Sequence, residues 1–365
     1  MSEFLSRNID RIVDWATRER HIERKLLYGG LACLAPLGFG LSLSFATKAL
    51  GRDLTICPLP SLPEPVQWCL ALVGALAITA ATVLAIARFR HDRAELDRRR
   101  VLVIEQRGLR DTTDTPLVDA IPRTMSGRKQ PLIVDLRDRI KDGVVTNPEA
   151  ALERLSGLPK TLEQMRGNTD PADISIVYGG LSPVPFTFLA GLLLDDESRV
   201  TVMDWDRNSD CWRGLDDKDD GASFTISGID KIQRGSKDVA VAVSVSYGID
   251  VNSVQKAVVG ASVVELELSP KSTDSHWSEE KQRRLAKCFL NAMIRIADTG
   301  VATIHLFIAA PNSVVFRFGR IYDKRNLPRV LVYQYQKGRE IEHPWAVDMP
   351  VHDLLQPGIP HTSTQ

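Results

Sequence analysis

Two short runs of small and polar residues are suited to binding an anionic ligand. The runs are Gly179, Gly180, Leu181, Ser182 and Pro183, and Ala309, Ala310, Pro311, Asn312 and Ser313. Each follows a β-rich stretch and precedes a helical one, which is where open α/β folds bind ligands. Small residues let a ligand approach the backbone, while Ser182 and Asn312 favour helix N-caps and Pro183 a first helical position. Free N–H groups at two helix starts suit phosphate, so we expect one pocket with two anion-binding rims.

Aromatic and basic side chains near the ends of the expected strands could add to this pocket. The aromatic ones are Trp205, Trp212, Tyr333 and Tyr335, and the basic ones are Arg207, Arg213, Lys324 and Arg325. Aromatic rings stack on nucleobases and guanidinium groups pair with phosphate, although each such residue alone is more often a packing residue or a solvated charge. The expected ligand-binding set is Gly179, Gly180, Leu181, Ser182, Pro183, Trp205, Arg207, Ala310, Pro311, Asn312, Ser313, Tyr333 and Tyr335.

Acidic residues leave open the alternative of a membrane-anchored α/β enzyme that hydrolyses a nucleotide. One cluster is Asp195, Asp196, Asp204 and Asp206, and the other is Asp216, Asp217, Asp219 and Asp220. The second lacks the order of an EF-hand loop and indicates an acidic surface loop. No Ser-His-Asp arrangement, G-x-G-x-x-G order, Walker A motif or C-x-x-C pair is present. We therefore expect no catalytic residue, no metal and no cofactor.

An internal repeat relates the two turns. Placing Ile174 over Ile304, a shift of 130 (304 minus 174), aligns about thirty residues without a gap. In this alignment ISIVYGGLSPVPFTF lies over IHLFIAAPNSVVFRF. Each copy has the order strand, small-residue turn, helix, strand, which predicts two fused Rossmann-like halves.

The pattern of short β-rich runs and helical stretches from Asp173 onward favours α/β layers. The expected strands are Ile174–Tyr178, Val200–Met203, Val239–Tyr247, Val263–Leu268, Thr303–Ile308 and Val330–Tyr335. The expected helices are Val184–Leu194, Val251–Val259 and Ser278–Asp298. Upstream we expect a charged helix at Arg88–Arg107, a linker at Leu109–Gln130, a short strand at Ile133–Leu136 and a helix at Pro148–Met165.

Two uncharged apolar segments, Leu26–Thr47 and Val66–Ala87, are each long enough to cross about 30 Å of hydrocarbon as a helix. The loop between them carries only two cations, Lys48 and Arg52, whereas the outer flanks are strongly basic. By the positive-inside rule, both termini are expected to be cytoplasmic. Gly29, Gly30, Gly74 and Ala75 would allow close helix packing.

Before the first span, apolar residues recur at helical spacing, namely Phe4, Leu5, Ile9, Ile12, Val13 and Ala16. This segment is expected either to lie on the inner leaflet or to pack on a neighbouring subunit. Over the whole chain 46 basic residues balance 46 acidic ones, which argues against a partner such as DNA or long RNA.

At the repeated motifs the chain resembles the SAVED domain family. The matching stretches are YGGLSPVPFTFLAG, DDESRVTVMDWDR, IHLFIAAPNSVVFRFGR and VLVYQYQKGREIEHPW, and the resemblance covers about Ile133–Pro350. SAVED domains are fusions of two CARF-like units in bacterial cyclic-oligonucleotide anti-phage signalling systems. The expected fold is thus α/β, with two fused CARF-like Rossmann-type halves preceded by a two-helix transmembrane hairpin.

The resemblance implies a function that composition does not. The ligand would be a cyclic oligonucleotide made by a partner nucleotidyltransferase, and the expected ring size is a trinucleotide. Binding would cause self-association, and the spans would then disrupt the bacterial inner membrane in abortive infection. The expected domains are a cytosolic amphipathic segment (1–25), the two spans (26–87), a juxtamembrane helix and linker (88–132), the SAVED sensor (133–350) and a flexible tail (351–365).

Overall fold

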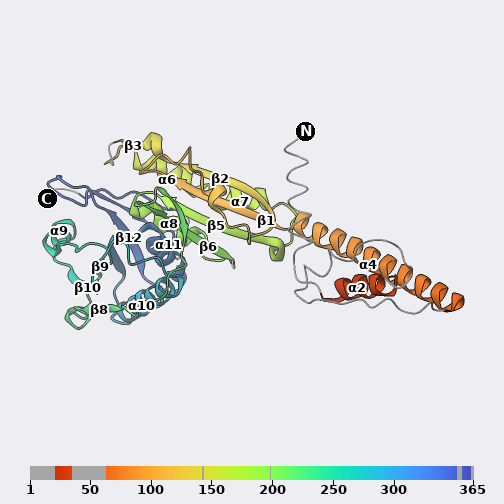
Figure 1. Cartoon of the computed structure of the whole chain (residues 1–365). Coiled ribbons are helices and arrows are strands. Elements are labelled where there is room, and N and C mark those ends of the chain that lie inside the picture. Colours follow the sequence, from red (N-terminus) through yellow and green to blue (C-terminus); the bar gives the residue numbers. More distant parts are fainter. Residues whose placement is uncertain (1–20, 35–62, 142–143, 198, 352–355, 363–365) are drawn as a thin grey trace. The chain divides into compact units, whose positions relative to one another are not determined.

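The computed structural model describes residues 21–34, 63–141, 144–197, 199–351 and 356–362 (Figure 1). The chain divides into two compact units, Met1–Leu96 and Asp97–Gln365. The expected amphipathic segment before residue 21, the second half of the first span and most of the loop between the spans lie outside the described residues. The expectations for these segments therefore remain predictions.

The first unit contains α2 (His21–Leu34) and most of α4 (Glu64–Arg98). Residues Glu64–Ala94 form a helix long and apolar enough to cross a membrane, and Lys25–Leu34 is a shorter apolar helix. The hydroxyls of Thr79 and Thr82 donate to the carbonyls one turn earlier, so neither leaves a free donor in an apolar surrounding. The expected helix across Val66–Ala87 agrees with α4.

The two helices of this unit approach each other at Gly30 and Gly74. A Cβ atom on Gly30 would lie 2.9 Å from the Gly74 carbonyl oxygen, and one on Gly74 would lie 2.9 Å from that of Gly30. A Cβ on Gly29, in contrast, would meet nothing within 4 Å. Of the small residues proposed for packing, Gly30 and Gly74 are therefore the pair at the contact.

The expectation of a charged helix over Arg88–Arg107 is wrong beyond Arg98. Residues Arg100–Arg107 form β1, which pairs in parallel with β2 (Arg128–Asp135) on one side and β5 (Ile174–Leu181) on the other. The run Val101–Ile104 is entirely apolar and buried on both faces, as strands of parallel sheets are. The sheet of the second unit therefore begins well before the expected sensor start at residue 133.

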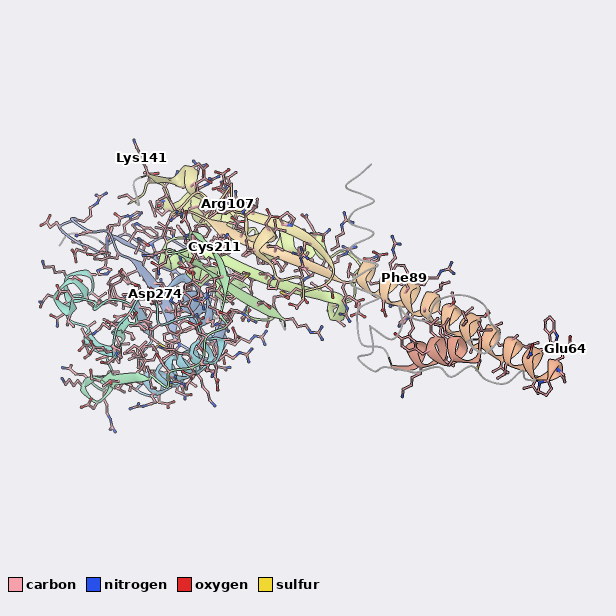
Figure 2. The ribbon with its side chains drawn as sticks, in the orientation of Figure 1. Glu64, Phe89, Arg107, Lys141, Cys211 and Asp274 are labelled. Atoms are coloured by element: carbon pink, nitrogen blue, oxygen red, sulfur yellow. The ribbon has the colours of Figure 1, made fainter. Side chains whose placement is uncertain are left out.

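The first sheet has the order β2-β1-β5-β6-β7, with β6 at Val200–Asp206 and β7 at Cys211–Gly214. Its helices are α5 (Leu117–Ala120), α6 (Pro148–Ser156), α7 (Leu158–Arg166) and α8 (Val184–Leu193), with a small β3–β4 hairpin at Ile140–Lys141 and Val144–Val145. The single helix expected at Pro148–Met165 is thus two helices that meet at Gly157. Figure 2 marks Arg107 at the end of β1 and Cys211 at the start of β7.

The second sheet has the order β13-β12-β11-β9-β10-β8. Its strands are β8 (Phe224–Ser227), β9 (Asp238–Ser244), β10 (Ser262–Leu268), β11 (Thr303–Ala309), β12 (Arg329–Gln334) and β13 (Trp345–Asp348). Its helices are α9 (Val251–Ala257), α10 (Glu279–Ala297) and α11 (Asn312–Ile321). Short 3-10 turns complete the unit at Arg137–Arg139, Pro171–Asp173 and Ile229–Lys231.

The two halves share one topology, which confirms the predicted duplication. In each half a central parallel strand (β1 or β9) lies between the next strand in sequence (β2 or β10) and a third strand (β5 or β11). A fourth parallel strand and a closing antiparallel strand follow, β6 and β7 in one half and β12 and β13 in the other. The order is that of doubly wound folds, whose switch point lies between the first and third strands.

The register predicted for the repeat is wrong by two residues at the turns. Pro183 precedes α8 and Pro311 precedes α11 as their N-cap residues, a shift of 128 (311 minus 183) rather than 130. Strand pairing limits this slip to part of the repeat, because Ile176 pairs with Val200 and Ile304 with Val330. These pairs relate β5 to β11 by 128 (304 minus 176) where β6 and β12 keep the predicted 130 (330 minus 200). The ungapped alignment was based on the alternation of apolar residues along the strands. A shift of two residues keeps the same side chains on the same face of a strand, so this alternation could not reveal the error.

Helices α8 and α11 pack on each other between the two sheets (Figure 1). A Cβ on Gly191 would overlap the Phe316 carbonyl oxygen, and one on Gly319 would overlap the Phe188 carbonyl oxygen. These pairs are again related by 128, so the crossing follows the symmetry of the repeat. The main hydrophobic core lies here, and smaller clusters cover the outer faces of the two sheets.

Candidate ligand-binding site

The carboxyl ends of the parallel strands bring the two predicted turns to comparable places. In the first half, the backbone N–H of Leu109, in the loop after β1, donates to the Leu181 carbonyl at 2.8 Å. In the second half, Val245 and Ser246, in the loop after β9, donate to the Ala309 carbonyl at 2.9 and 3.0 Å. Each switch point is thus closed by the same backbone contact, and a ligand of this fold class would bind beside it.

The glycines of the first turn lie in the strand itself, because β5 continues to Leu181 rather than ending at Tyr178. A Cβ on Gly179 would be 2.8 Å from the Trp212 ring, and one on Gly180 would overlap the Tyr178 hydroxyl. Ser182 is buried, and its hydroxyl accepts a hydrogen bond from Gln106 Nε2 at 3.0 Å. In this structure these small residues accommodate neighbouring side chains.

The helix starts differ from the prediction by one residue. The N-cap of α8 is Pro183 rather than Ser182, and the N-cap of α11 is Pro311 rather than Asn312. Asn312 is the first helical residue and its Oδ1 accepts from Thr187 Oγ1 at 3.2 Å, which ties α11 to α8. Ala310 is half-buried and follows the last residue of β11.

A carboxylate from the first half occupies the amino end of α11. The backbone N–H of Ser313 donates to Asp204 Oδ2 at 3.0 Å, and Gln282 Nε2 donates to the Ser313 hydroxyl at 2.8 Å. The position related to Ser313 by 128 is Pro185, which has no N–H. At this position neither helix start has a free N–H group, because one is paired with Asp204 and the other is absent. The expectation of free N–H groups at the two helix starts is not tested at their first residues, Val184 and Asn312, and stays a prediction there.

Asp204 is held charged in this buried place. Burial alone would raise the pKa of the Asp204 carboxyl, but the side chain of His276 and the hydrogen bonds from Ser313 lower it below its ordinary value. His276 Nε2 lies 3.3 Å from Asp204 Oδ2. Since His276 and Ser313 belong to the second half, this carboxylate links the halves.

The predicted aromatic and basic residues have different surroundings. Trp205 is buried against the edge of Trp212, while Arg207 just beyond β6 is exposed. Tyr333 is stacked on Phe307, and burial raises the pKa of its hydroxyl to about 12. Tyr335 is half exposed at the carboxyl end of β12, where its hydroxyl donates to Glu342. Of Trp205, Arg207, Tyr333 and Tyr335, the two open to a ligand are therefore Arg207 and Tyr335.

The acidic residues are engaged by basic side chains. Asp219 pairs with Arg284 and Asp220 with Lys281, both on α10, and Arg213 pairs with Asp216 and Asp217. The hydrogen bond from Arg284 lowers the pKa of Asp219 below its ordinary value. Within the described residues, no group of three or more His, Cys, Asp or Glu side chains is placed to hold a metal ion. The interpretation of Asp216–Asp220 as an acidic loop agrees with these contacts.

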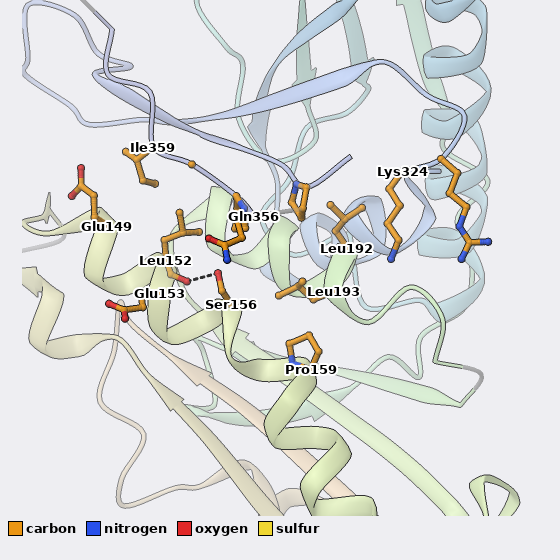
Figure 3. Close-up of a pocket in the computed structure, with 14 residues that line it drawn as sticks. Glu149, Leu152, Glu153, Ser156, Pro159, Leu192, Leu193, Lys324, Gln356 and Ile359 are labelled. Atoms are coloured by element: carbon orange, nitrogen blue, oxygen red, sulfur yellow. Dashed lines mark hydrogen bonds between the residues drawn. The ribbon is translucent and has the colours of Figure 1, made fainter. Parts of the chain in front are cut away.

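Two of the cavities among the described residues are relevant to the site, and both lie in the second unit. One of about 1320 Å³ is formed by α6, the end of α8, Lys324, Arg325 and Pro357–Ile359 (Figure 3). It includes two of the basic residues considered for phosphate, Lys324 and Arg325, but no member of the expected ligand-binding set. The other, about 490 Å³, is lined by Asp111, Asp135, Arg137, Asp138 and Arg154. This smaller hollow lies at the carboxyl end of β2, beside the first switch point. The hydrogen bond from Arg137 lowers the pKa of Asp135 there.

The segment from Glu105 to Thr113 is the part of the site that sequence reasoning assigned to a helix and linker. Buried Glu105 accepts hydrogen bonds from Arg107, Thr112 and the backbone of Leu117. Gln106 accepts from the Tyr178 hydroxyl at 2.7 Å and donates to Ser182. The available signal was a run of four apolar residues ending in polar ones and a glycine, which is typical of a buried strand and its turn.

Comparisons with known proteins agree with this architecture. Residues 158–349 match the model of the SMODS-associated and fused to various effectors sensor domain (SAVED), and residues 2–152 match that of the SAVED-fused 2TM effector domain. A search of curated proteins finds no match. Strands β1 and β2 fall in the part matched by the effector model.

Several solved structures are similar in outline. An Acinetobacter baumannii Cap4 SAVED/CARF-domain containing receptor with the cyclic trinucleotide 2'3'3'-cAAA is 12% identical, with a TM-score of 0.48, over 84% of this chain and 64% of that one. The same receptor with 3'3'3'-cAAA is 14% identical, with a TM-score of 0.46 and the same coverage. A Moraxella osloensis Cap4 receptor is 10% identical, with a TM-score of 0.44, over 93% of this chain and 84% of that one.

The SAVED model covers 192 of the 365 residues (158–349), which is more than half of the chain. Together with the duplicated α/β halves and the apolar helices of the first unit, this match identifies the family. The chain belongs to the SAVED family of sensor domains, fused to a two-transmembrane effector domain.

Proposed function

We propose that this protein is a membrane-embedded effector of bacterial anti-phage defence that is switched on by a cyclic oligonucleotide. The SAVED unit binds the messenger, a cyclic trinucleotide made by a partner nucleotidyltransferase, and then self-associates. The transmembrane helices of the assembled chains disrupt the inner membrane and end the infection by killing the cell. The chain spans the membrane twice with both termini in the cytoplasm, and it has no catalytic activity or cofactor.

The observation that carries this proposal is the duplication of the switch point within one unit. One switch point lies at the carboxyl ends of β1 and β5, and the other lies at the carboxyl ends of β9 and β11. The halves that carry them are connected by the packing of α8 on α11 and by the Asp204–Ser313 hydrogen bond. A ligand with repeated nucleotides can meet equivalent groups from both halves. The family supports the ligand class, and the apolar helix Glu64–Ala94 supports a membrane output.

A liposome experiment tests both parts. The full chain is reconstituted in dye-loaded vesicles and titrated with cyclic di-, tri- and tetranucleotides, while binding is followed by calorimetry. We expect one cyclic trinucleotide to bind and to release dye above a threshold of chains per vesicle. Tight binding without release would reject the membrane output, and no binding by any member of the panel would reject the sensor function.

The alternative is a membrane-anchored enzyme that hydrolyses a nucleotide. Of the acidic clusters that motivate it, Asp216–Asp220 is held in ion pairs with Arg213, Lys281 and Arg284. In the other cluster, Asp195 pairs with Lys324. Incubating the full chain with the same nucleotides and measuring recovery of intact ligand separates the two functions. Full recovery is expected, and conversion to linear products would favour the enzyme.

A further inference from the structure

The loops after β1 and β9 occupy corresponding positions at the two switch points. Arg107 pairs with Leu181 at the end of β1, and Ser244 pairs with Ala309 at the end of β9. These pairs relate the loops by a shift of 137 (244 minus 107). Under this shift Arg110 in the first loop corresponds to Tyr247 in the second.

The first loop lies directly on residues already placed at the site. A Cβ on Gly108 would lie 3.2 Å from the Leu181 carbonyl oxygen and 3.3 Å from Pro183. The Arg110 guanidinium lies over the Trp205 ring at 5.0 Å from its centroid, a cation–π contact. Among the described residues no acceptor reaches the buried Trp205 Nε1, which leaves a donor beneath this cation.

Arg110 has a charge partner that it can exchange. It pairs with Asp210, and both side chains are largely exposed, 44% and 62%. A surface ion pair of this kind contributes little stability, because water competes for both charges. An incoming phosphate can therefore replace Asp210, and the planar guanidinium suits bidentate contact with phosphate oxygens.

Tyr247 is an exposed aromatic ring at the corresponding place. It is 60% exposed, although its neighbours Ser244 and Val245 are buried. The loop that carries it is fixed, because Ser246 N–H donates to Ala309 and Ile249 N–H donates to the Ser244 hydroxyl at 3.2 Å. An aromatic ring that is open to solvent on a loop of fixed backbone is suited to stacking on a base.

We infer that the loops after β1 and β9 complete the nucleotide site, with Arg110 binding a phosphate and Tyr247 stacking on a base. This inference rests on the proposed function and adds contacts from outside the two predicted turns. It also places one half of the site in the segment matched by the effector model, 2–152. Arg110 follows the end of β1, and one residue, Arg99, separates the start of β1 from the end of α4. A ligand bound at Arg110 would therefore contact the segment that continues from the membrane helix.

The test measures the affinity of the full detergent-solubilised chain for 2'3'3'- and 3'3'3'-linked cyclic triadenylate, and for a panel of other cyclic trinucleotides. Arg110→Ala and Tyr247→Ala should each weaken binding about tenfold or more. Tyr247→Phe keeps the ring and should bind within about threefold of the unchanged chain. Matched controls are Arg123→Ala and Val259→Ala, exposed residues before the amino ends of β2 and β10, and neither should change affinity.

Asp210→Asn distinguishes two roles of Arg110, direct contact with the ligand and structural support of the loop through its ion pair with Asp210. If Arg110 binds phosphate, removing its competing carboxylate leaves affinity equal or higher. If Arg110 only secures the loop, Asp210→Asn should weaken binding as Arg110→Ala does, which would overturn its assignment. Normal binding by both alanine variants would overturn the inference while the sensor function stands, whereas no binding by the unchanged chain would overturn both.

Discussion

The carboxylate of Asp204, at the carboxyl end of β6, accepts a hydrogen bond from the backbone N–H of Ser313 in the first turn of α11. A side chain of one half thereby occupies the anion position at a helix start of the other half. The contact continues through Gln282 to Arg317 at 2.8 Å, so that β6, α10 and α11 share one buried polar network. This network joins the two halves by buried polar contacts.

Asp204→Ala should destabilise the chain by about 2–4 kcal/mol, because it leaves the Ser313 N–H buried without its acceptor and removes the carboxylate that lies 3.3 Å from buried His276. Asp204→Asn keeps an acceptor oxygen and should cost less. Urea denaturation in mild detergent measures both, and exposed Asp230→Ala is the control. Equal stability of the alanine variant and the control would show that the network contributes nothing.

Gly191→Ala should separate α8 from α11, since the added Cβ would overlap the Phe316 carbonyl oxygen. We expect a loss of about 2 kcal/mol or more, as overpacking against backbone cannot be relieved by a rotamer change. Gly214→Ala is the matched control, because a Cβ there meets nothing within 4 Å. Thermal unfolding by circular dichroism compares the two, and the same melting temperature for both would contradict the close crossing.

Gly30→Leu should force α2 and α4 apart, because its Cβ would meet the Gly74 backbone and Ile78. If the packed hairpin is the unit that assembles in the membrane, ligand-induced dye release should fall to about a tenth or less. Gly29→Leu adds the same apolar side chain where a Cβ meets nothing within 4 Å, and it should retain release. Equal activity of the two variants would argue that the Gly30–Gly74 contact has no part in the output.

Stability should fall in mild acid because of His343. Burial lowers the pKa of His343 in the folded chain to about 4, below the ordinary value of 6.5. Between these values the unfolded chain binds a proton that the folded chain does not, so stability is full above about pH 6.5 and is lost as the pH falls. From pH 7.5 to 5.0 the loss assigned to His343 is about 2 kcal/mol.

His343→Phe should remove this part of the pH dependence, since the ring contact with Phe307 can persist and His343 Nδ1 has no partner among the described residues. Exposed His361→Gln, which removes a different histidine, is the comparison variant. The measurement is the free energy of unfolding at pH 7.5 and 5.0 for the three chains. An unchanged difference in the phenylalanine variant would contradict the assignment to His343.

The sequence by itself determined the features that depend on local pattern. Uncharged apolar length predicted the helix across Val66–Ala87, because backbone groups in hydrocarbon must be satisfied within the segment. The repeat of strand, turn and helix around Pro183 and Pro311 predicted two related halves, which the two sheets confirm. The four stretches that match SAVED domains also predicted the family, and the match to the SAVED model confirms it.

Only the tertiary structure decided which residues meet at the site. Arg100–Arg107 follows a highly charged helix, and its strand character depends on pairing with β2 and β5, which are distant in sequence. The use of Asp204 to fill the start of α11 likewise depends on a partner 109 residues away. Local pattern specifies periodicity and charge, whereas register and the placing of Arg110 and Tyr247 follow from strand pairing within each half. The pairing of the buried polar groups around Asp204 follows from packing between the halves.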